Sequence, residues 1–522
     1  MSKSIIVRFL LLFSIFYCEL SVNGQSYKEK HRLQVHYSIP SGWSNDPNGL
    51  IYLDGYYHLY FQHNPVDTRF GPMHWGHARS RDLIHWETLP IALKPYEKGV
   101  IFSGCCIHDE NNVTGIRPNV LYNPNASSTT LIALYTLTKD EDQSQALAYS
   151  FDNGTTWTQY DANPVIPNPG ISDFRDPNVF ERNGKFYMTL AVRDRISFYV
   201  STDLLSWEKL SDFGVSPDEG YKIGVWECPS LFTLTDEEGK AHDILIVSLN
   251  GDLEGSKSQY FIGQFNGSRF NTYDKSRILW IDNGFDNYAA IPYHNDPAGR
   301  IVLIGWLSNW LYAQDIPTST WRGQMTIPRE MGLRTIDDDL HIVQRPVVEL
   351  KGIIDPARNW STSEPLTLTG RQTIEVTSEI PFKTGSQLIL DYAFDIGQVK
   401  NGQIEVRFSN TKDEFVSFNY NIEKRTYGFD RRYSGDVTFN PRFADPLPRI
   451  DRISGSNLLS GQIILDTASI EIFADDGLNT ISALFFPSEL FEKIHLRSSI
   501  DAGKSVTVPK LSVAALNSIW PK

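Results

Sequence analysis

Three acidic residues stand in short aromatic stretches that contain a proline and little other charge. They are Asp46 in WSNDPNG, Asp176 in FRDP and Glu227 in WECP. Surface acids usually lie among mixed charges, so an acid in such company either caps a turn or lines a pocket. For any one of them the turn is the better interpretation, because Asp-Pro and Asn-Pro commonly start turns.

The spacing of the three acids favours a shared pocket instead. Asp176 follows Asp46 by 130 residues and precedes Glu227 by 51, close to two lengths and one length of the repeat described below. Hydrolysis of a glycosidic bond needs one carboxylic acid to protonate the leaving oxygen and a second carboxylate to attack or stabilise the oxocarbenium-like centre. Three acids that converge on one funnel therefore predict glycosidase chemistry.

Aromatic and amide side chains near these acids fit a sugar substrate. Aromatic rings stack on the apolar faces of sugars, and amides bond to hydroxyls. The aromatic candidates are Trp43, Phe70, Trp75, Phe102 and Trp310, and the amide candidates are Asn45 and Gln62. Core packing accounts equally well for an aromatic content of 12%.

The elements that must position these residues are strands. Short runs such as YYHLYF and TLIALY are rich in β-branched and aromatic residues and are bounded by Gly, Asn, Asp or Pro, and long helical periodicity is missing from the sequence. A Ser-x-Asp turn followed by Trp recurs at Ser80, Ser150 and Ser201. A repeat of roughly 50–70 residues favours the radial blades of a propeller. Turn-capping Asp and core Trp in a sandwich are the alternative.

The chain of 522 residues is too long for one ordinary core. We expect a five-bladed β-propeller over residues 25–345, a linker over 346–362 and a C-terminal β-sandwich over 363–522. The last part contains runs such as QIEVRF and SIEIF, which alternate apolar and polar residues as half-buried antiparallel strands do. The predicted class is therefore all-β.

Residues 1–24 have the basic start, apolar run and small cleavage-site residues of a secretory signal peptide. A membrane anchor is the weaker alternative, because the apolar run is shorter than the ~20 residues that cross a bilayer. The mature chain would keep Cys105, Cys106 and Cys228, which do not make a disulfide framework and are expected to be buried. Five Asn-x-Ser/Thr sequons, at Asn112, Asn125, Asn153, Asn266 and Asn359, fit a secreted glycoprotein.

The net charge argues against two classes of partner. The formal net charge is −14, and basic residues form no run along the chain. An acidic balance repels nucleic acid and anionic membranes, so we expect neither as a partner. The cysteines and histidines lack the spacing of metal ligands, so we expect no metal and no cofactor. A neutral small-molecule or oligosaccharide substrate fits better.

From His36 to its C-terminus the sequence resembles glycoside hydrolase family 32, the invertase, inulinase and levanase group. WSNDPNG is similar to the family's WMNDPNG, with Ser44 in place of Met. The family's other motifs follow in order as FQHNP, WGHARSRDLIHW, FSG, FRDP, WECP, TWRGQMTIPRE, DRRYSG and SIEIFADDG. The resemblance implies a five-bladed propeller followed by a β-sandwich.

The resemblance also implies roles. Asp46 would be the nucleophile, Asp176 the stabiliser of the transition state and Glu227 the acid/base. The fructose subsite would be lined by Asn45, Gln62, Phe70, Phe102, Ser103, Arg175 and Trp310, with Phe70 standing where the family usually has Trp. We therefore expect a secreted retaining β-fructofuranosidase acting on sucrose, inulin or levan. A fructosyltransferase on the same scaffold and an inactive sugar-binding propeller are the alternatives.

Overall fold

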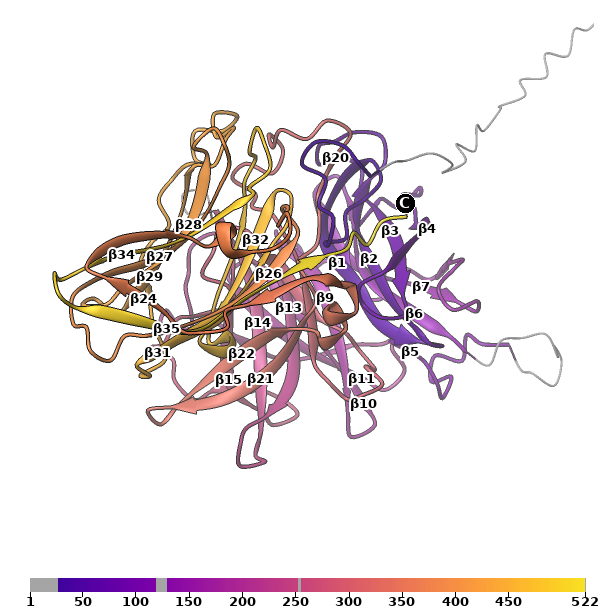
Figure 1. Ribbon diagram of the computed structural model, residues 1–522. Helices are drawn as coiled ribbons and strands as arrows, with labels where there is room; N and C mark the ends of the chain where they lie inside the picture. The colour runs from indigo at the N-terminus through magenta and orange to yellow at the C-terminus, as the bar shows by residue number, and fades with distance from the viewer. Residues whose placement is uncertain (1–26, 119–128, 252–254, 522) are drawn as a thin grey trace, which may run out of the picture.

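The first part of the chain forms a β-propeller. The computed structural model describes residues 27–118, 129–251 and 255–521, so the predicted signal peptide lies outside the described residues. Five antiparallel sheets follow one another around an axis (Figure 1). Their strands are β1 Gly42–Leu53, β2 Tyr56–Asn64, β3 His74–Ser80 and β4 Trp86–Leu93; β5 Val100–His108, β6 Leu131–Lys139, β7 Asp142–Ser150 and β8 Thr158–Gln159; β9 Phe174–Arg182, β10 Lys185–Val192, β11 Arg195–Ser201 and β12 Glu208–Phe213; β13 Val225–Thr235, β14 Ala241–Gly251, β15 Gly255–Phe265, β16 Phe270–Thr272 and β17 Leu279–Trp280; and β18 Tyr288–Pro292, β19 Val302–Trp306, β21 Arg329–Ile336 and β22 Asp339–Pro346.

The innermost strands of the five blades enclose a central channel. Strands β1, β5, β9, β13 and β18 contact one another in a closed ring. The short strand β20, Trp321–Arg322, leaves the fifth blade and pairs in parallel with Gly42 and Trp43 of β1. This pairing joins the last blade to the first. Because each innermost strand starts at the same end of the channel, side chains near the five strand starts meet there.

The recurring Ser-x-Asp motif forms the turn between the third and fourth strands of a blade. In the first blade Asp82 Oδ1 accepts the backbone N–H groups of Ile84 and His85 at 3.0 and 2.8 Å, and Ser80 Oγ donates to it at 3.0 Å. Asp203 holds the same turn in the third blade, with bonds of 2.9 and 2.7 Å. A carboxylate that caps backbone donors in this way stabilises a tight turn. The repeat therefore marks blades, as predicted.

The second part of the chain is a sandwich of two antiparallel sheets, drawn in orange and yellow beside the blades in Figure 1. Apolar side chains from the facing sides of the sheets form one core, which includes Phe418, Ile472 and Val506. The elements are β23 Ile354–Ser361, β24 Leu366–Thr369, β35 Ser505–Leu516, β26 Leu388–Asp395, β31 Leu458–Leu465, β32 Ser469–Ala474 and β33 Asn479–Leu484 in one sheet; β25 Arg371–Glu375, β34 Lys493–Ile500, β27 Gly402–Ser409, β28 Phe415–Asn421, β29 Thr426–Tyr433 and β30 Ile450–Asp451 in the other; and the 3₁₀ turns η1 Val348–Ile353, η2 Val376–Glu379 and η3 Asp475–Gly477. The predicted all-β class with a propeller and a sandwich is confirmed.

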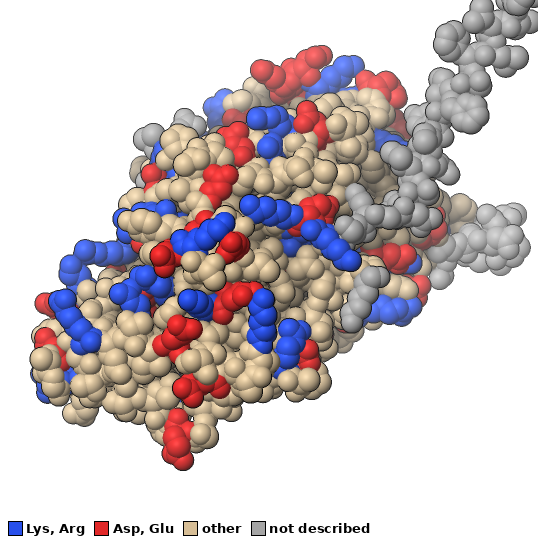
Figure 2. All heavy atoms as spheres, turned by 45° about the horizontal axis from the view of Figure 1, so that its top comes forward, with Lys and Arg blue, Asp and Glu red and all other residues tan. Residues whose placement is uncertain are grey.

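The outer surface matches the mixed composition. Figure 2 shows acidic and basic side chains interspersed over the face in view, without a broad area of one sign. Within the described ranges, no helix is both long enough and apolar enough to span a membrane. All three cysteines of the described chain are free and buried, as predicted.

A buried ionic cluster joins the two domains. His36, ahead of the first blade, contacts Asp466 Oδ2 through Nδ1 at 2.8 Å and Glu471 Oε1 through Nε2 at 2.9 Å. Glu471 also accepts two hydrogen bonds from Arg329 of the fifth blade. Burial by itself would lower the pKa of His36, but the two carboxylates outweigh it and raise that pKa to about 9. The imidazolium therefore holds the propeller against the sandwich.

Alkaline pH is expected to loosen this interface. The folded pKa of His36, about 9, lies above the unfolded value near 6.5, so the stabilisation is complete below about pH 6.5 and is lost as the pH rises through about 9. The shift corresponds to about 3 kcal/mol. We expect His36→Gln to lower the Tm strongly at pH 6 and much less at pH 9.5, as measured by calorimetry.

His85→Gln is the matched control. The His85–Asp82 pair has the same 2.8 Å separation, but its side chains are 55% and 42% exposed, so solvent screens it. Its removal is expected to leave the pH dependence of the Tm unchanged. An equal loss of Tm for His36→Gln at both pH values would contradict the assigned charge on His36.

Candidate active site

The three acids predicted from the sequence gather at one end of the channel. Asp46 lies near the start of β1, Asp176 near the start of β9 and Glu227 near the start of β13, so they come from three different blades. Asp46 and Asp176 are 8% and 5% exposed, and the Glu227 side chain is 16% exposed. The mouth of the channel therefore holds three closely placed and largely dry carboxyl groups.

Local breaks in the strand register turn these side chains toward the channel. Each innermost strand departs from regular pairing at this level, and such bulges re-aim side chains and are frequent beside active sites. The irregular stretches lie between Ser44 and Pro47, between Ile101 and Gly104, opposite Thr189 and Ala191, between Glu227 and Ser230, and between Tyr288 and Ile291. Asp176 itself has a φ of 63°, a left-handed conformation that Asp tolerates better than most residues. The irregular backbone is what places the acids together.

Asp46 is held by donors that favour its ionised form. Ser103 Oγ donates to Oδ2 at 2.7 Å, and Asn45 Nδ2 donates to Oδ1 at 3.0 Å. Asn45 is itself fixed, because Trp43 Nε1 donates to its side-chain oxygen at 2.8 Å. These bonds orient the carboxyl group and offset part of the cost of burying its ionised form.

Asp176 shares a neighbour with Asp46. The Cys228 thiol lies 3.4 Å from Asp46 Oδ2 and 3.6 Å from Asp176 Oδ2, and the Cys228 backbone N–H donates to Asp176 Oδ2 at 3.1 Å. Burial and the neighbouring carboxylates raise the pKa of the Cys228 thiol well above its ordinary value. The thiol therefore stays protonated and acts as a weak donor between the two acids.

Glu227 is engaged through both of its oxygens. Arg175 donates to Oε1 from Nε at 3.0 Å and from Nη2 at 2.9 Å. The Tyr288 hydroxyl donates to Oε2 in a short hydrogen bond. Arg175 is in turn held by Asp173 Oδ1 at 2.6 Å. The carboxyl group is thus fixed in plane by donors from two other blades.

The electrostatics keep a proton in this cluster. Burial raises the pKa of Asp46, the charge of Glu227 adds to the rise, and hydrogen bonds from Ser103, Asn45 and Cys228 oppose it. Burial also raises the pKa of Asp176; the Arg175 charge opposes this, while Glu227 and Asp46 add to it. Burial and the repulsion between these closely placed carboxylates therefore favour the protonated forms of Asp46 and Asp176. A site of this kind can hold one acid protonated while another is ionised, as acid-assisted displacement requires.

The aromatic residues divide into a rim and a supporting layer. Phe70, 42% exposed, meets Trp310 edge-on at 5.6 Å and Phe102 at 6.1 Å, so these three form an apolar wall at the mouth. The stacking role considered for Trp43 and Trp75 is wrong, because both rings are 0% exposed. They pack behind the wall, where a sugar cannot reach them.

The remaining predicted residue, Gln62, lies on the second strand of the first blade, 2% exposed. Its Nε2 donates to Asn48 Oδ1 at 2.9 Å, which ties Gln62 to β1 two residues beyond Asp46. The sequence reasoning missed three residues around the acids: Cys228, which touches Asp46 and Asp176; Tyr288, which touches Glu227; and Asp173, which holds Arg175. Cys228 adjoins Glu227 in sequence and was therefore detectable, whereas Tyr288 stands in the unremarkable run NYAAIP.

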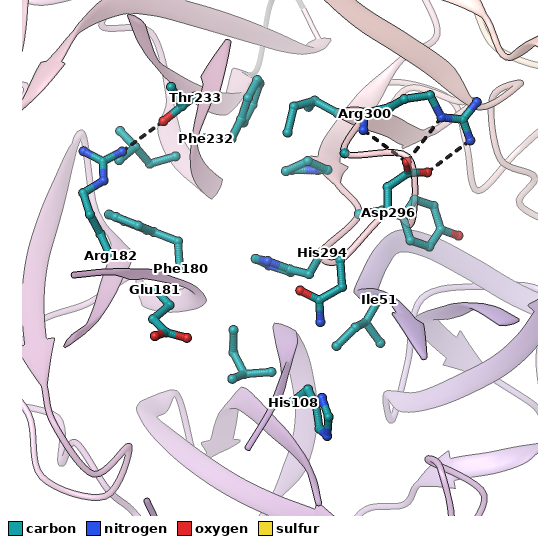
Figure 3. A pocket seen from close by; sticks show the side chains of 17 residues that line it. Ile51, His108, Phe180, Glu181, Arg182, Phe232, Thr233, His294, Asp296 and Arg300 are labelled. Carbon is teal, nitrogen blue, oxygen red and sulfur yellow. Dashed lines mark hydrogen bonds and ion pairs between the residues drawn. The ribbon is translucent and has the colours of Figure 1, made fainter. Parts of the chain in front are cut away.

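A pocket of about 400 Å³ occupies the opposite end of the same channel. Figure 3 shows its lining, to which the far ends of the innermost strands contribute Ile51, His108, Phe180 and Phe232. Its arginines are engaged: Arg182 bonds Asp243 at 2.6 Å and Arg300 bonds Asp296 at 3.1 Å. The cluster of closely placed acids described above is at the other mouth.

Within residues 27–118, 129–251 and 255–521, no three His, Cys, Asp or Glu side chains gather as metal ligands would.

Comparisons with known proteins agree with this geometry. The family model "Glycosyl hydrolases family 32 N-terminal domain" matches residues 36–346, and "Glycosyl hydrolases family 32 C terminal" matches residues 355–515. A levanase of Bacillus subtilis is 37% identical over 99% of this chain and 75% of its own length. An extracellular exo-inulinase of Aspergillus ficuum is 34% identical over 98% of this chain and 99% of its own. The structure of a β-fructofuranosidase from Schwanniomyces occidentalis, complexed with fructosyl-erythritol, superposes with a TM-score of 0.82 at 27% identity, covering 95% of this chain and 100% of that one.

Proposed function

The chain belongs to glycosyl hydrolase family 32, and from that premise we propose that it is a retaining β-fructofuranosidase. It hydrolyses terminal non-reducing fructofuranosyl residues of sucrose and of fructans such as inulin and levan. The observation that carries the proposal is the meeting of Asp46, Asp176 and Glu227 at one channel mouth, each held differently by its neighbours. The levanase and exo-inulinase relatives support fructans as substrates.

The reaction proceeds in two displacements at C2 of the fructosyl unit. In the first, an Asp46 oxygen attacks C2 while the bond from C2 to the leaving oxygen breaks and Glu227 gives its proton to that oxygen. In the second, Glu227 takes a proton from water, whose oxygen attacks C2 and displaces Asp46. Asp46 is suited to attack because Ser103 and Asn45 hold both its oxygens. Each step leaves Glu227 ready for the next.

Asp176 and its neighbours supply binding. Asp176 lies beside Asp46, with the Cys228 thiol between the two carboxyl groups. Its oxygens accept fructose hydroxyl groups, and those bonds strengthen as positive charge develops on the ring. Asn45, Gln62, Ser103 and Arg175 provide the remaining polar contacts of this subsite. Phe70, Phe102 and Trp310 form the wall against which the apolar face of the sugar packs.

Water is the main acceptor of the fructosyl group. The resemblance to hydrolytic members of the family, in which an Asn stands beside the nucleophile as Asn45 does here, supports hydrolysis over transfer. Transfer to sugar is expected only at high sugar concentration. The predicted signal peptide over residues 1–24 and the extracellular relative support secretion of the enzyme.

The test is a product time course on sucrose, inulin and levan with the purified mature chain. Fructose is expected to appear from the first minutes, without early short fructan oligomers, because an end-acting enzyme removes one unit at a time. Failure to release fructose from any of the three would overturn the proposal. Fructan oligomers accumulating ahead of free fructose from sucrose would indicate a transferase.

A further inference from the structure

Among the residues that the structure describes, Tyr288 is the hydrogen-bond partner that the fifth blade contributes to Glu227. It begins β18 and is 1% exposed, and its hydroxyl donates to Glu227 Oε2. The register of β18 breaks immediately after it, and Ala289 has a φ of 52°. The Ala289 N–H is tied to Ser248 Oγ at 3.1 Å. This break in regular strand pairing directs the Tyr288 phenol toward the Glu227 carboxyl group.

The phenol completes a clamp on Glu227. Arg175 occupies Oε1 with two N–H bonds of 3.0 and 2.9 Å, so Tyr288 is the donor at the other oxygen. The Tyr288 ring is fixed by Trp306, whose ring centroid lies 6.4 Å away at an interplanar angle of 68°. A carboxyl group with both oxygens held cannot rotate about its last bond. The proton that Glu227 donates, and the lone pair that later accepts one, are therefore held in a fixed orientation.

We propose that Tyr288 is a positioning residue for the acid/base: its hydroxyl orients Glu227 and stabilises the negative charge that Glu227 acquires as it protonates the leaving group. The inference rests on the proposed function, because it assumes that Glu227 gives up a proton in the first displacement. As the proton departs, the O–H bond from Tyr288 becomes charge-assisted and therefore stronger. An interaction that strengthens toward the transition state accelerates the step.

The phenol itself remains a donor throughout the cycle. Burial raises the pKa of Tyr288 well above its ordinary value, and the nearby charge of Glu227 adds to the rise. The other titratable or charged groups facing Glu227 are Arg175 and Asp176 from β9, Asp46 from β1 and the Cys228 thiol from its own strand. Substituting any of those four residues would change the charge of the cluster or disturb another acid. Tyr288 can be changed to Phe with loss of one hydroxyl and no change of charge.

The test compares Tyr288→Phe with Tyr312→Phe. Tyr312 is the matched control, because its hydroxyl also donates to a buried carboxylate, Asp286 Oδ1 at 2.6 Å, outside the acid cluster. Two substrates are used for each variant: sucrose, whose leaving sugar needs a proton, and β-fructofuranosyl fluoride, whose fluoride leaves with little help. kcat/KM reports the first displacement for both substrates.

For Tyr288→Phe we expect kcat/KM on sucrose to fall about 10- to 100-fold, the range for a hydrogen bond to a charged group. The loss on the fluoride should be several-fold smaller. The pH–rate profile should move to higher pH, since loss of the Tyr288 hydroxyl removes a hydrogen-bond donor that stabilises the ionised form of Glu227. Tyr312→Phe should lower the Tm, but it should leave the pH–rate profile unchanged and should affect kcat/KM on sucrose and on the fluoride equally.

Equal losses on the two substrates with an unmoved pH profile would overturn the proposal, and so would activity equal to wild type. Circular dichroism and Tm identify a variant that fails to fold; in that case Tyr288→His, which restores an N–H donor on a smaller side chain, must recover activity in part. Failure of the proposed function is a separate result, because wild type would then release no fructose from sucrose.

Discussion

Replacing Asp46 with asparagine is expected to lower kcat on sucrose by about four to six orders of magnitude, as loss of a nucleophile does in other covalent mechanisms. The amide keeps the size of the carboxylate and can still meet Ser103 Oγ and Asn45 Nδ2, so the fold should survive. It cannot attack C2 or carry the fructosyl group. Steady-state kinetics with purified protein, checked against Tm, measure the loss.

Asp109→Asn is the control for Asp46→Asn. Asp109 is also buried, at 1% exposure, but it holds a loop by accepting the Thr114 hydroxyl at 2.6 Å. Its replacement should lower the Tm and leave kcat per folded molecule within a few-fold of wild type. If Asp46→Asn retained more than a tenth of wild-type turnover while folded, Asp46 would not be the nucleophile.

The second large effect is expected at Glu227, and it should depend on the leaving group. Glu227→Gln cannot protonate the leaving sugar, so kcat/KM on sucrose should fall by about three to four orders of magnitude. β-Fructofuranosyl fluoride should still react with Asp46, because fluoride needs little acid assistance. Water then attacks slowly without a general base, so fluoride should appear in a burst of about one equivalent per site before slow turnover. A stopped assay of fluoride against enzyme concentration measures this burst.

Equal loss on sucrose and fluoride, with no burst, would contradict the assignment of Glu227 as the acid/base. In Glu227→Gln the side-chain oxygen can still accept a hydrogen bond from Arg175 or from Tyr288. A loss due to misplacement of the side chain would affect both substrates alike. The comparison therefore separates proton transfer from positioning.

The sequence alone predicted the elements whose signals are local. The Ser-x-Asp turns could be read because Asp82 and Asp203 bond backbone groups two or three residues away. The three acids were recognisable because their aromatic and proline neighbours are adjacent in the chain. The stacking role predicted for Trp75 was wrong because the sequence around a tryptophan does not show whether its ring is buried or faces a substrate. The burial of Trp75 depends on the strands that pack around it.

Contacts between distant segments left no such signal. His36 pairs with Asp466, 430 residues further along, and nothing near either residue indicates the other. Tyr288 meets Glu227 across 61 residues, through a break in strand register that follows from how two blades pack. The predicted site thus contained the acids and the subsite residues but lacked the side chain that completes the clamp on Glu227.

The measurement that tests the central claim most directly is the anomeric form of the first fructose released. If Asp46 attacks C2 and water then displaces it from the same face that the leaving group vacated, the first product is β-fructofuranose. Proton spectra recorded within the first minute, before mutarotation, distinguish the anomers. The account predicts initial β-anomer together with a small amount of fructosyl transfer at high sucrose. Initial release of the α-anomer with no transfer product would contradict the covalent mechanism and the role of Asp46.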